Sequence, residues 1–391
     1  MYLNNYINND MVDNWPRRAL SHEMDRMKLI VNRPSLPSWS EFEELAKEIW
    51  DSGYLTNFGT VHNKLLHNLE LVFKTANFAL CNNCTNGLIG AIKIIALPKK
   101  KKVITTPFTF AATAHSIIWA EKEPVFVDIG KEGFCISPET VEPAIDSNTS
   151  AILPVHCYGL PCDIEGFRKL SHKTGIPVIY DAAHAFGVKV NGKSLLSEGS
   201  ASIVSTHATK VFNTVEGGIA YFSDNKHLQR FTAMTNFGIN RGMTDQLGFN
   251  GKLSELHAAV GLLSLKDFSK RVIERSKVWN YYDKFFSEID AVETSVIPHG
   301  VKLNYAYYPV KIVNRNINLD DLVRKLAAKD IIVRKYFSEL LTKMPFFKDS
   351  IIIGTLDNAA AISDRILCLP IHENYVSHMD FITTEFLTAI K

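Results

Sequence analysis

The sequence predicts an α/β fold with two domains: a large one with a mostly parallel sheet between helices, and a smaller α+β one. Three observations lead to this prediction. Short apolar runs alternate with amphipathic stretches from about residue 100 onward, which is the rhythm of βαβ units. The strand-like runs are apolar on both faces, as expected for strands covered by helices on two sides. After about residue 252 the pattern changes to long helical stretches.

The length of 391 residues favours two or three domains. We expect a loosely held polar arm over residues 1–33, a large domain over residues 34–250 and a small domain over residues 251–391.

Two helices are predicted before the sheet begins. Ser38 followed by Glu41 has the spacing of a capping box, and Gly53 marks the end of the helix behind it. The apolar residues of that helix fall at helical spacing: Phe42, Leu45, Ile49 and Trp50. A second helix is expected over residues 86–97, because Pro98 stops it.

The sheet is predicted from a series of short apolar runs. The expected strands are residues 103–106, 124–128, 151–155, 176–181, 202–205 and 218–222. Residues 138–145 and 164–174 have helical character between them. Strands separated by helices run parallel, so we expect a mostly parallel sheet.

The C-terminal part has a different pattern. Residues 253–268 and 272–289 are predicted to form two long helices. Residues 307–313 and 331–334 are strand-like, with a helix expected over residues 319–328 between them. This mixture predicts the smaller α+β domain.

Charge and hydropathy argue against several classes of function. The 43 basic and 41 acidic side chains give a formal charge of +2, which supplies no broad positive field for nucleic acid. The run Lys99–Lys102 is interpreted as a solvated loop. The first 20 residues contain no apolar signal segment, and no apolar stretch approaches the length needed to cross a bilayer. We therefore expect a cytoplasmic protein.

The cysteines do not indicate a metal or redox centre. In a reducing compartment all six are expected to be free thiols. They are Cys81, Cys84, Cys135, Cys157, Cys162 and Cys368. Cys81 and Cys84 form a C-x-x-C, but no second pair with matching spacing follows. We expect no bound metal.

Polar residues just past the predicted strands indicate a ligand site. In open parallel sheets, ligands bind at the carboxyl ends of the strands. The residues expected at this edge include a carboxylate, a lysine, an aromatic ring and a helix N-terminus: Thr85, Asn86, Phe110, Asp181, Ser205 and Lys210. This combination suits pyridoxal 5'-phosphate.

Each group answers one requirement of that cofactor. A lysine amine forms a Schiff base with an aldehyde, and a carboxylate keeps the pyridine nitrogen protonated. A helix N-terminus with hydroxyls binds a phosphate, and an aromatic ring covers the face of the cofactor. Taken singly, each residue has a simpler interpretation: Asp181 as a turn residue or helix cap, Lys210 as a surface lysine and Phe110 as a core residue. Their order and spacing along the chain favour the cofactor site.

The motifs that contain these residues resemble those of the DegT/StrS-type sugar aminotransferases, a branch of the fold-type I pyridoxal-phosphate enzymes. The resemblance runs from about Pro34 to Pro370. The matching segments are residues 55–57, 83–88, 106–113, 124–128, 154–159, 181–185, 205–210 and 216–218. One departure is Cys84, which stands where the family usually has glycine.

The resemblance implies roles around the cofactor ring. Lys210 would form the Schiff base and then move the proton between the substrate carbon and the cofactor. Asp181 would pair with the pyridinium nitrogen, and His184 would lie beside the ring hydroxyl. Phe110 would stack on the ring.

The resemblance also implies how the phosphate is held. Thr85, the backbone amide of Asn86 and Ser205 would bind it within one subunit. A further residue comes from a neighbouring subunit in the family, and Asn250 matches its motif in residues 248–255. An ordinary turn residue is the alternative for Asn250. A homodimer with shared sites is therefore implied.

Within the family the resemblance is greatest to transaminases of dTDP-4-amino-4,6-dideoxyglucose. It implies transfer of an amine from L-glutamate, through the pyridoxamine form of the cofactor, to a nucleotide-linked keto-sugar. The implied acceptor is dTDP-4-dehydro-6-deoxy-D-glucose, and the implied pathway is surface-polysaccharide (O-antigen) synthesis.

Two alternatives stay open at this point. One is amination at carbon 3 of a nucleotide sugar or of a cyclitol, with Thr56, Asn57 and Tyr336 as candidate substrate residues. The other is a cofactor-binding regulator without turnover, which the retention of Lys210 beside a full set of cofactor residues disfavours. Sugar dehydration, which the resemblance associates with histidine at the position of Lys210, is argued against by that lysine.

Overall fold

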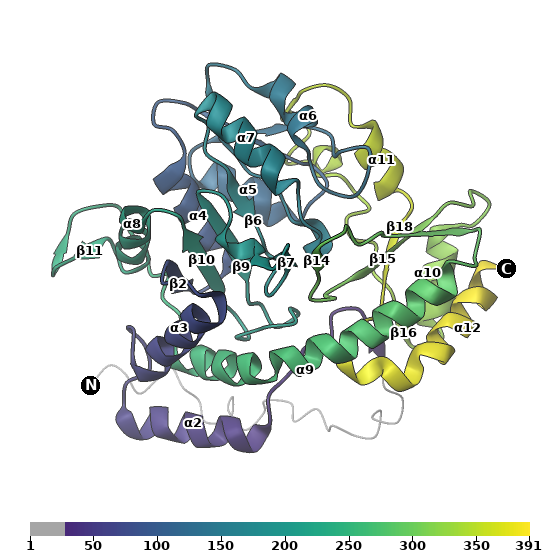
Figure 1. The fold of residues 1–391 in the computed structure, drawn as a ribbon, viewed down its shortest axis with the longest axis horizontal. Helices are drawn as coiled ribbons and strands as arrows, with labels where there is room; N and C mark the ends of the chain where they lie inside the picture. The colour runs from purple at the N-terminus through teal and green to yellow at the C-terminus, as the bar shows by residue number, and fades with distance from the viewer. Residues whose placement is uncertain (1–27) are drawn as a thin grey trace, which may run out of the picture.

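The structure is a computed structural model that describes residues 28–391. A large α/β part and a smaller C-terminal part lie side by side, and helix α9 (Glu255–Phe286) runs along both of them (Figure 1). This arrangement confirms the predicted α/β class.

The large part is built on two four-stranded sheets that meet edge to edge. One has the order β2 (Phe78–Cys81), β10 (Gly218–Phe222), β9 (Ala201–Ser205), β6 (Ile179–Asp181). The other has the order β17 (Ile351–Ile352), β4 (Glu123–Phe126), β3 (Lys102–Thr105), β5 (Thr149–Ile152). Two parallel bridges, Ile152 with Val178 and Val155 with Asp181, join them.

Strand β10 departs from the predicted parallel pattern. It pairs antiparallel with both β2 and β9, whereas β3, β4, β5 and β17 pair parallel with one another. Residues 206–217, which connect β9 to β10, contain no helix. Parallel neighbours are usually joined by a crossover helix, and without one the chain returns here in the opposite direction.

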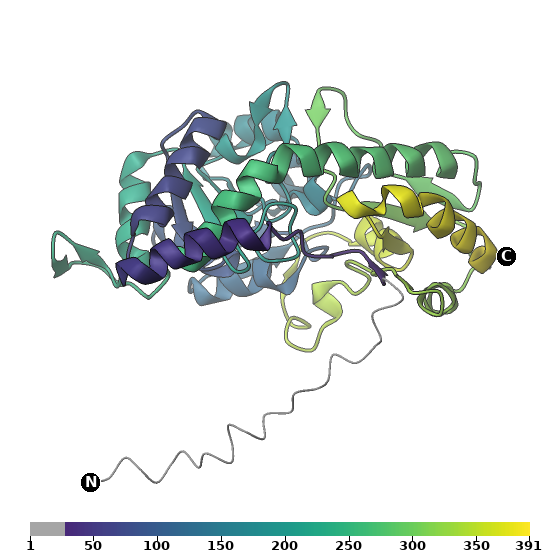
Figure 2. The same ribbon diagram turned by 90° about the horizontal axis from the view of Figure 1, so that it is seen from below.

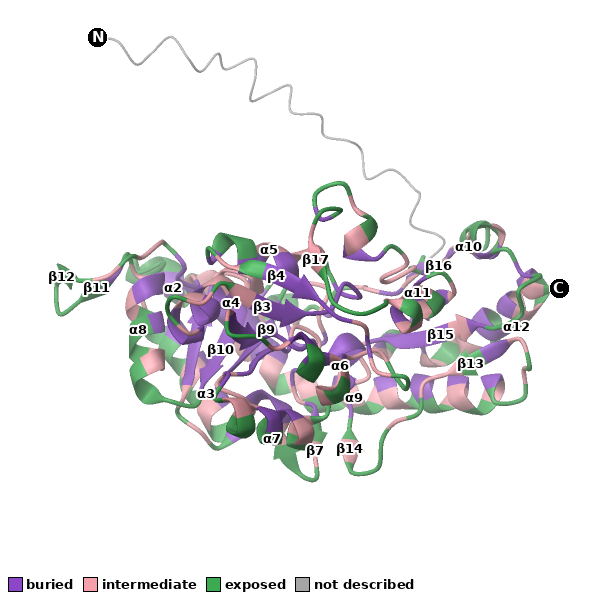
Figure 3. Ribbon diagram, turned by 90° about the horizontal axis from the view of Figure 1, so that it is seen from above, coloured by how far each residue is buried: buried purple, intermediate pink, exposed green. Residues whose placement is uncertain are grey.

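Helices cover both faces of this sheet, and its strands are almost wholly buried (Figure 3). The helices of the large part are α2 (Trp39–Ser52), α3 (Thr60–Phe73), α4 (Cys84–Ile95), α5 (Ala111–Trp119), α6 (Pro138–Val141), α7 (Ile164–Thr174) and α8 (Asn225–Thr235). Short hairpins lie at its surface: β7 (Lys189–Val190), β8 (Lys193–Ser194), β11 (Ile239–Asn240), β12 (Met243–Thr244) and β14 (Val301–Lys302).

The predicted capping box at the start of α2 does not form. Helix α2 begins and ends where the sequence predicts, but the Ser38 side chain makes no cap hydrogen bond and instead contacts Ser40. Glu41 pairs with Lys266 of α9. An ion pair with α9 has replaced the predicted capping hydrogen bonds.

Helix α9 is continuous where the sequence predicts two helices. No glycine or proline interrupts residues 262–290, so nothing in the backbone chemistry ends the helix near residue 270. Arg271 and Asp267 form an i,i+4 ion pair of 3.6 Å across the predicted gap.

The smaller part packs a three-stranded antiparallel sheet against helices. Its elements are β13 (Val292–Thr294), β15 (Tyr308–Ile312), β18 (Ile366–Leu369), β16 (Ile331–Ile332), α10 (Leu319–Ala327), α11 (Asp357–Ser363) and α12 (Met379–Ile390). Strand β17 leaves this part to join the large sheet at β4.

Part of the predicted loose arm is packed. Strand β1 (Leu29–Ile30) pairs parallel with β16, and Leu29 and Val31 are buried. In Figure 2 this segment runs from helix α2 into the C-terminal part. The prediction for residues 1–27 lies outside the described residues.

Two buried histidines give the fold a pH dependence. Burial lowers the pKa of His156 to about 3 and that of His372 to about 4, from 6.5. The unfolded chain therefore binds protons below pH 6.5 that the folded chain does not. The contribution of these histidines to the free energy of unfolding is fully present above pH 6.5. It falls as the pH drops toward the pKa values of the folded chain, by about 2 kcal/mol per histidine at pH 5.

We expect His372→Asn to lose less stability than the wild type between pH 7 and pH 5. Asparagine retains an acceptor for the Asn374 N–H, which binds His372 Nδ1 at 3.1 Å. Urea unfolding at the two pH values measures the effect, and the exposed His299→Asn serves as control. Equal losses in all three proteins would contradict the assignment to His372.

The remaining predictions concern thiols, metals and membranes. All six cysteines are free. Among residues 28–391, no group of three or more histidine, cysteine or acidic side chains is arranged to hold a metal ion. Within the same range, no helix combines the length and apolar character needed to span a bilayer.

Candidate active site

One cavity of about 350 Å³ opens at the carboxyl ends of the large sheet. Six residues predicted for the cofactor line it: Thr85, Phe110, Asp181, His184, Ser205 and Lys210. The predicted substrate residue Tyr336 lines it as well, together with Tyr307 and Phe337 from the C-terminal part. The cavity therefore lies between the two parts of the chain.

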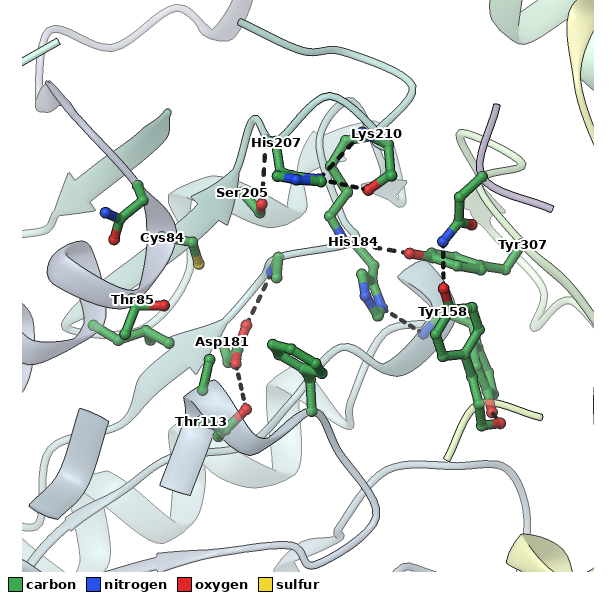
Figure 4. A pocket seen from close by; sticks show the side chains of 18 of the residues that line it. Cys84, Thr85, Thr113, Tyr158, Asp181, His184, Ser205, His207, Lys210 and Tyr307 are labelled. Carbon is green, nitrogen blue, oxygen red and sulfur yellow. Dashed lines mark hydrogen bonds between the residues drawn. The ribbon is translucent and has the colours of Figure 1, made fainter. Parts of the chain in front are cut away.

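Asp181 ends strand β6 and lies at the floor of this cavity, with only 4% of its surface exposed (Figure 4). Its Oδ2 accepts a hydrogen bond of 2.7 Å from Thr113 Oγ1, and its Oδ1 accepts one of 3.0 Å from the Ala183 N–H. Burial raises the pKa of Asp181, and these donors and the Lys210 charge oppose that rise. A cation beside this carboxylate would be strongly stabilised.

Lys210 lies five residues after strand β9 and extends into the same cavity (Figure 4). Its Nζ donates a 3.2 Å hydrogen bond to the hydroxyl of Tyr307. Burial lowers the pKa of Lys210, and the negative charge of the Asp181 carboxylate opposes this effect. The neutral amine, which is the nucleophilic form, is thereby favoured.

His184 is held in one protonation state and one tautomer. Burial lowers its pKa well below 6.5, and the Lys210 charge adds to this effect. The Tyr158 backbone N–H donates to His184 Nδ1 at 3.1 Å, so the neutral ring carries its proton on Nε2. The Tyr307 ring lies 4.6 Å from the imidazole. His184 therefore offers one directed N–H donor.

The other end of the cavity has groups suited to an anion. Helix α4 begins here, and Cys84 and Thr85 occupy its first turn, where backbone N–H groups lack intrahelical acceptors. The hydroxyl-bearing Ser205 follows from the end of β9. Together they offer hydrogen-bond donors of the kind that bind an anion such as a phosphate.

Asn86, predicted to bind the phosphate through its backbone amide, uses that amide within helix α4. Its backbone N–H donates at 2.8 Å to Asn83 Oδ1, the cap of α4, and its side chain bonds to Asn82. Asn86 does not line the cavity. The backbone N–H of Asn86 donates to the N-cap side chain, because Asn83 stands at the N-cap position three residues earlier.

Phe110 stands at the N-cap position of α5 and is 65% exposed. Such exposure is unusual for phenylalanine. Since the residue lines the cavity, its ring is available to cover a flat ligand.

Three predicted residues lie away from this cavity. Thr56 and Asn57 are exposed in the turn before α3, where the Tyr54 hydroxyl donates to Asn57 O at 2.8 Å. Asn250 is also exposed, and its Oδ1 accepts a 2.8 Å bond from Lys252 Nζ. Within one chain, none of the three reaches the site.

Sequence reasoning missed several lining residues. Thr113 could have been predicted from the sequence, because it lies one helical turn after Phe110 and so shares a helix face with it. Tyr158 lies in the matching segment 154–159 but was given no role there, and Tyr307 comes from a segment remote from the predicted motifs. His207, within the 205–210 motif, also lines the cavity, and its Nδ1 lies 2.8 Å from Thr209 Oγ1.

The described residues fit pyridoxal 5'-phosphate. The buried carboxylate of Asp181 suits a protonated ring nitrogen, and the amine of Lys210 suits an aldehyde. The first turn of α4 with Ser205 suits a phosphate, and the exposed Phe110 suits a planar ring. One cavity holds all four groups.

Comparison with known proteins agrees with this fit. Residues 38–379 match the DegT/DnrJ/EryC1/StrS aminotransferase family. Two dTDP-4-amino-4,6-dideoxy-D-glucose transaminases are similar along most of their length. The one from Shigella dysenteriae is 37% identical over 347 residues, covering 88% of this chain and 94% of its own. The one from Escherichia coli is 36% identical over 357 residues, covering 89% and 95%.

A solved structure has the same fold. DesI, determined in the presence of its TDP-sugar product, superposes with a TM-score of 0.88 at 28% identity and covers 94% of both chains. The chain belongs to the DegT/DnrJ/EryC1/StrS aminotransferase family, and its cofactor is pyridoxal 5'-phosphate.

Proposed function

We propose that this chain transfers the amine of L-glutamate to dTDP-4-dehydro-6-deoxy-D-glucose and releases dTDP-4-amino-4,6-dideoxy-D-glucose and 2-oxoglutarate. The observation that carries this proposal is the joining of Lys210 and Asp181 in one cavity of a chain that is 36–37% identical to two such transaminases. The product would serve surface-polysaccharide (O-antigen) synthesis. The cytoplasmic location stays a prediction.

Lys210 is the proposed catalytic residue. When bound, pyridoxal 5'-phosphate supplies the aldehyde that receives the amine and the ring that takes up electrons. Lys210 Nζ takes the proton from the substrate carbon as a general base and returns it as a general acid. The lowered pKa of this amine favours the first of these steps.

The other residues would hold and orient the cofactor. Asp181 would keep the ring nitrogen charged, and His184 would donate Nε2–H to the ring hydroxyl. Phe110 would cover the ring face. Thr85 and Ser205 would bind the phosphate; Asn86 has no part in this proposal, because its amide is engaged by Asn83.

A substrate panel tests the proposed specificity. Purified enzyme with glutamate is offered dTDP-linked and UDP-linked sugars that carry the keto group at carbon 3 or at carbon 4, and a keto-cyclitol. We expect the dTDP-linked 4-keto sugar to give the highest kcat/KM. A 3-keto sugar or the cyclitol as the preferred acceptor would refute the proposed substrate. A cofactor absorbance that glutamate leaves unchanged would favour the non-enzyme alternative.

Tyr307→Phe should lower kcat/KM by about tenfold without unfolding the protein. The tyrosine hydroxyl is the hydrogen-bond partner of Lys210 Nζ. A hydrogen bond between neutral groups is worth about 0.5–1.5 kcal/mol, and the upper end of that range corresponds to about tenfold in rate. Steady-state kinetics measure the change. Tyr305→Phe, at a half-buried tyrosine outside the cavity, is the matched control. Equal activity in both variants would contradict a role for the hydroxyl.

We also propose that the active unit is a homodimer in which Asn250 completes the site of the other subunit. Asn250 is exposed and remote from its own cavity. The neighbouring hairpin β11–β12 projects from the large part (Figure 1) and carries the exposed side chains Ile239 and Met243. Exposed apolar side chains of this kind favour burial against a partner.

Mixing two inactive variants tests this sharing. In a hybrid of Lys210→Ala and Asn250→Ala subunits, one site carries both changes and the other carries neither. Equal mixing after reversible dissociation should restore about a quarter of the wild-type rate. If each subunit forms its whole site alone, mixing restores nothing.

A further inference from the structure

The segment that follows strand β1 reaches the active-site cavity, which Asn32 lines. This segment is fixed on both sides of Asn32. Before it, the Ile30 N–H donates to the hydroxyl of Tyr375 at 3.0 Å. After it, Asn213 Nδ2 donates to the backbone oxygen of Ser35 at 2.9 Å. The backbone around Asn32 is therefore held in place, which lowers the entropy that its side chain loses when it binds a ligand.

Asn32 belongs to a group of neutral hydrogen-bonding side chains in that cavity. Its Nδ2 donates to the hydroxyl of Tyr336, and the ring of Tyr336 lies 5.9 Å from that of Tyr307 at an interplanar angle of 87°. The backbone oxygen of Tyr336 accepts a hydrogen bond from the Tyr158 hydroxyl, which fixes this residue in turn. We call Asn32, Tyr307 and Tyr336 the donor wall.

Each member of the donor wall keeps one hydrogen to donate. The hydroxyl of Tyr307 accepts from Lys210 Nζ, and the hydroxyl of Tyr336 accepts from Asn32 Nδ2, so both retain their own O–H. The amide of Asn32 retains a second N–H. Among residues 28–391, none of these three hydrogens has an acceptor. Three available donors at one side of a cavity suit an anionic group.

The donor wall lies beside the amine of the proposed catalytic lysine. The Tyr307 hydroxyl is 3.2 Å from Lys210 Nζ. Figure 4 shows Tyr307 at the opposite side of the cavity from Thr85, which belongs to the first turn of α4. A carbon that gives its proton to Lys210 must come within about 3–3.5 Å of Nζ. A carboxylate bonded to that carbon can then reach the donor wall.

The other charged side chains of the cavity are engaged elsewhere. No arginine is among the described residues that line it. The carboxylate of Asp181 accepts from Thr113, and that of Glu216 lies 3.5 Å from His207 Nε2. A carboxylate that enters the cavity therefore depends on neutral donors, and the donor wall supplies them.

We propose that the donor wall binds the α-carboxylate of L-glutamate, and that Asn32 selects the amino donor by this contact. The inference rests on the proposed function, because it assigns a residue to the donor half of that reaction. Hydrogen bonds to an ionised group are stronger than those to a neutral group. The donor wall should therefore hold a carboxylate better than a carboxamide. The keto-sugar has no α-carboxylate, so its use should not depend on this contact.

Two amino donors that differ only at the α position test the assignment. L-Isoglutamine carries a carboxamide where L-glutamate carries the α-carboxylate. In a reaction of two halves, kcat/KM for each substrate reports on its own half. We expect Asn32→Ala to lower kcat/KM for glutamate by about tenfold or more. The values for isoglutamine and for the keto-sugar should stay nearly unchanged. Asn32→Asp, which places a second carboxylate against the first, should lower the value for glutamate by about 10²-fold.

Binding without turnover gives a second readout. 2-Methyl-L-glutamate has no hydrogen on its α carbon for Lys210 to remove, so titration of the holoenzyme with it, followed by cofactor absorbance, measures binding alone. We expect Kd to rise about tenfold in Asn32→Ala. Asn316→Ala, at an exposed asparagine outside the cavity, is the matched control and should bind as the wild type does. The Asn32 side chain makes one described hydrogen bond, so the variant should still fold.

The outcomes separate this inference from the proposed function. A wild-type enzyme that takes no amine from glutamate would refute the proposed function. If the wild type does take it and Asn32→Ala binds 2-methyl-L-glutamate equally well, only the role of Asn32 is overturned. An equal loss for glutamate and isoglutamine, or a loss confined to the keto-sugar, would also overturn it, because Asn32 would then act on something other than the α-carboxylate.

Discussion

Lys210→Ala is expected to abolish the reaction with glutamate, with a fall in rate of at least about 10³-fold. Lys210 Nζ is the one lysine amine in the described lining of the cavity, and positioned acid–base groups contribute about 10²–10⁴-fold. Loss of the covalent bond between Lys210 and the cofactor adds to this effect. Conversion of glutamate to 2-oxoglutarate in a single turnover measures it directly.

Lys266→Ala provides the matched control. Lys266 is exposed and pairs with Glu41 on the surface, so its loss should leave the single turnover unchanged. The Lys210→Ala protein should unfold near the wild-type temperature, because its amine makes one described hydrogen bond. Normal turnover in Lys210→Ala would refute the proposed role of this residue.

Asp181→Asn should both weaken cofactor retention and lower kcat, the latter on the order of 10²-fold. The amide cannot balance a charged ring nitrogen, and each lost unit of pKa for that nitrogen costs about 1.4 kcal/mol. Asparagine keeps an acceptor for Thr113 Oγ1, which lies 2.7 Å from the present carboxylate. The fold should therefore survive the change.

Cofactor retention is measured by dialysis followed by absorbance, and kcat by steady-state assay at saturating cofactor. Asp320→Asn, an exposed carboxylate paired with Lys335, is the control. If Asp181→Asn retains cofactor and rate as the control does, the charge partner of the ring nitrogen is a different group.

Most of the sheet could be predicted from local sequence. Strands β3, β4, β5, β6 and β9 overlap the predicted runs, and helix α7 has the predicted bounds. Buried parallel strands are apolar on both faces, which makes them visible as continuous runs. Their carboxyl ends share one edge, so the expectation that Asp181 and Lys210 would lie together needed no knowledge of the connections.

Two of the errors share one cause, which is that a nonlocal contact replaced a local preference. Glu41 pairs with Lys266 rather than with its own helix N-terminus. Helix α9 is a different case, because it continues through residue 270 where no glycine or proline interrupts it. Residues 29–31 are ordered by β16, some 300 residues away in sequence.

The sequence by itself determined the fold class and the set of reactive groups, because strand periodicity and residue chemistry are properties of short segments. Only the tertiary structure decided that Tyr158 and Tyr307 complete the cavity and that the Asn86 amide is already bound. These facts depend on which distant segments come within a few ångströms, and packing of the whole chain sets such distances.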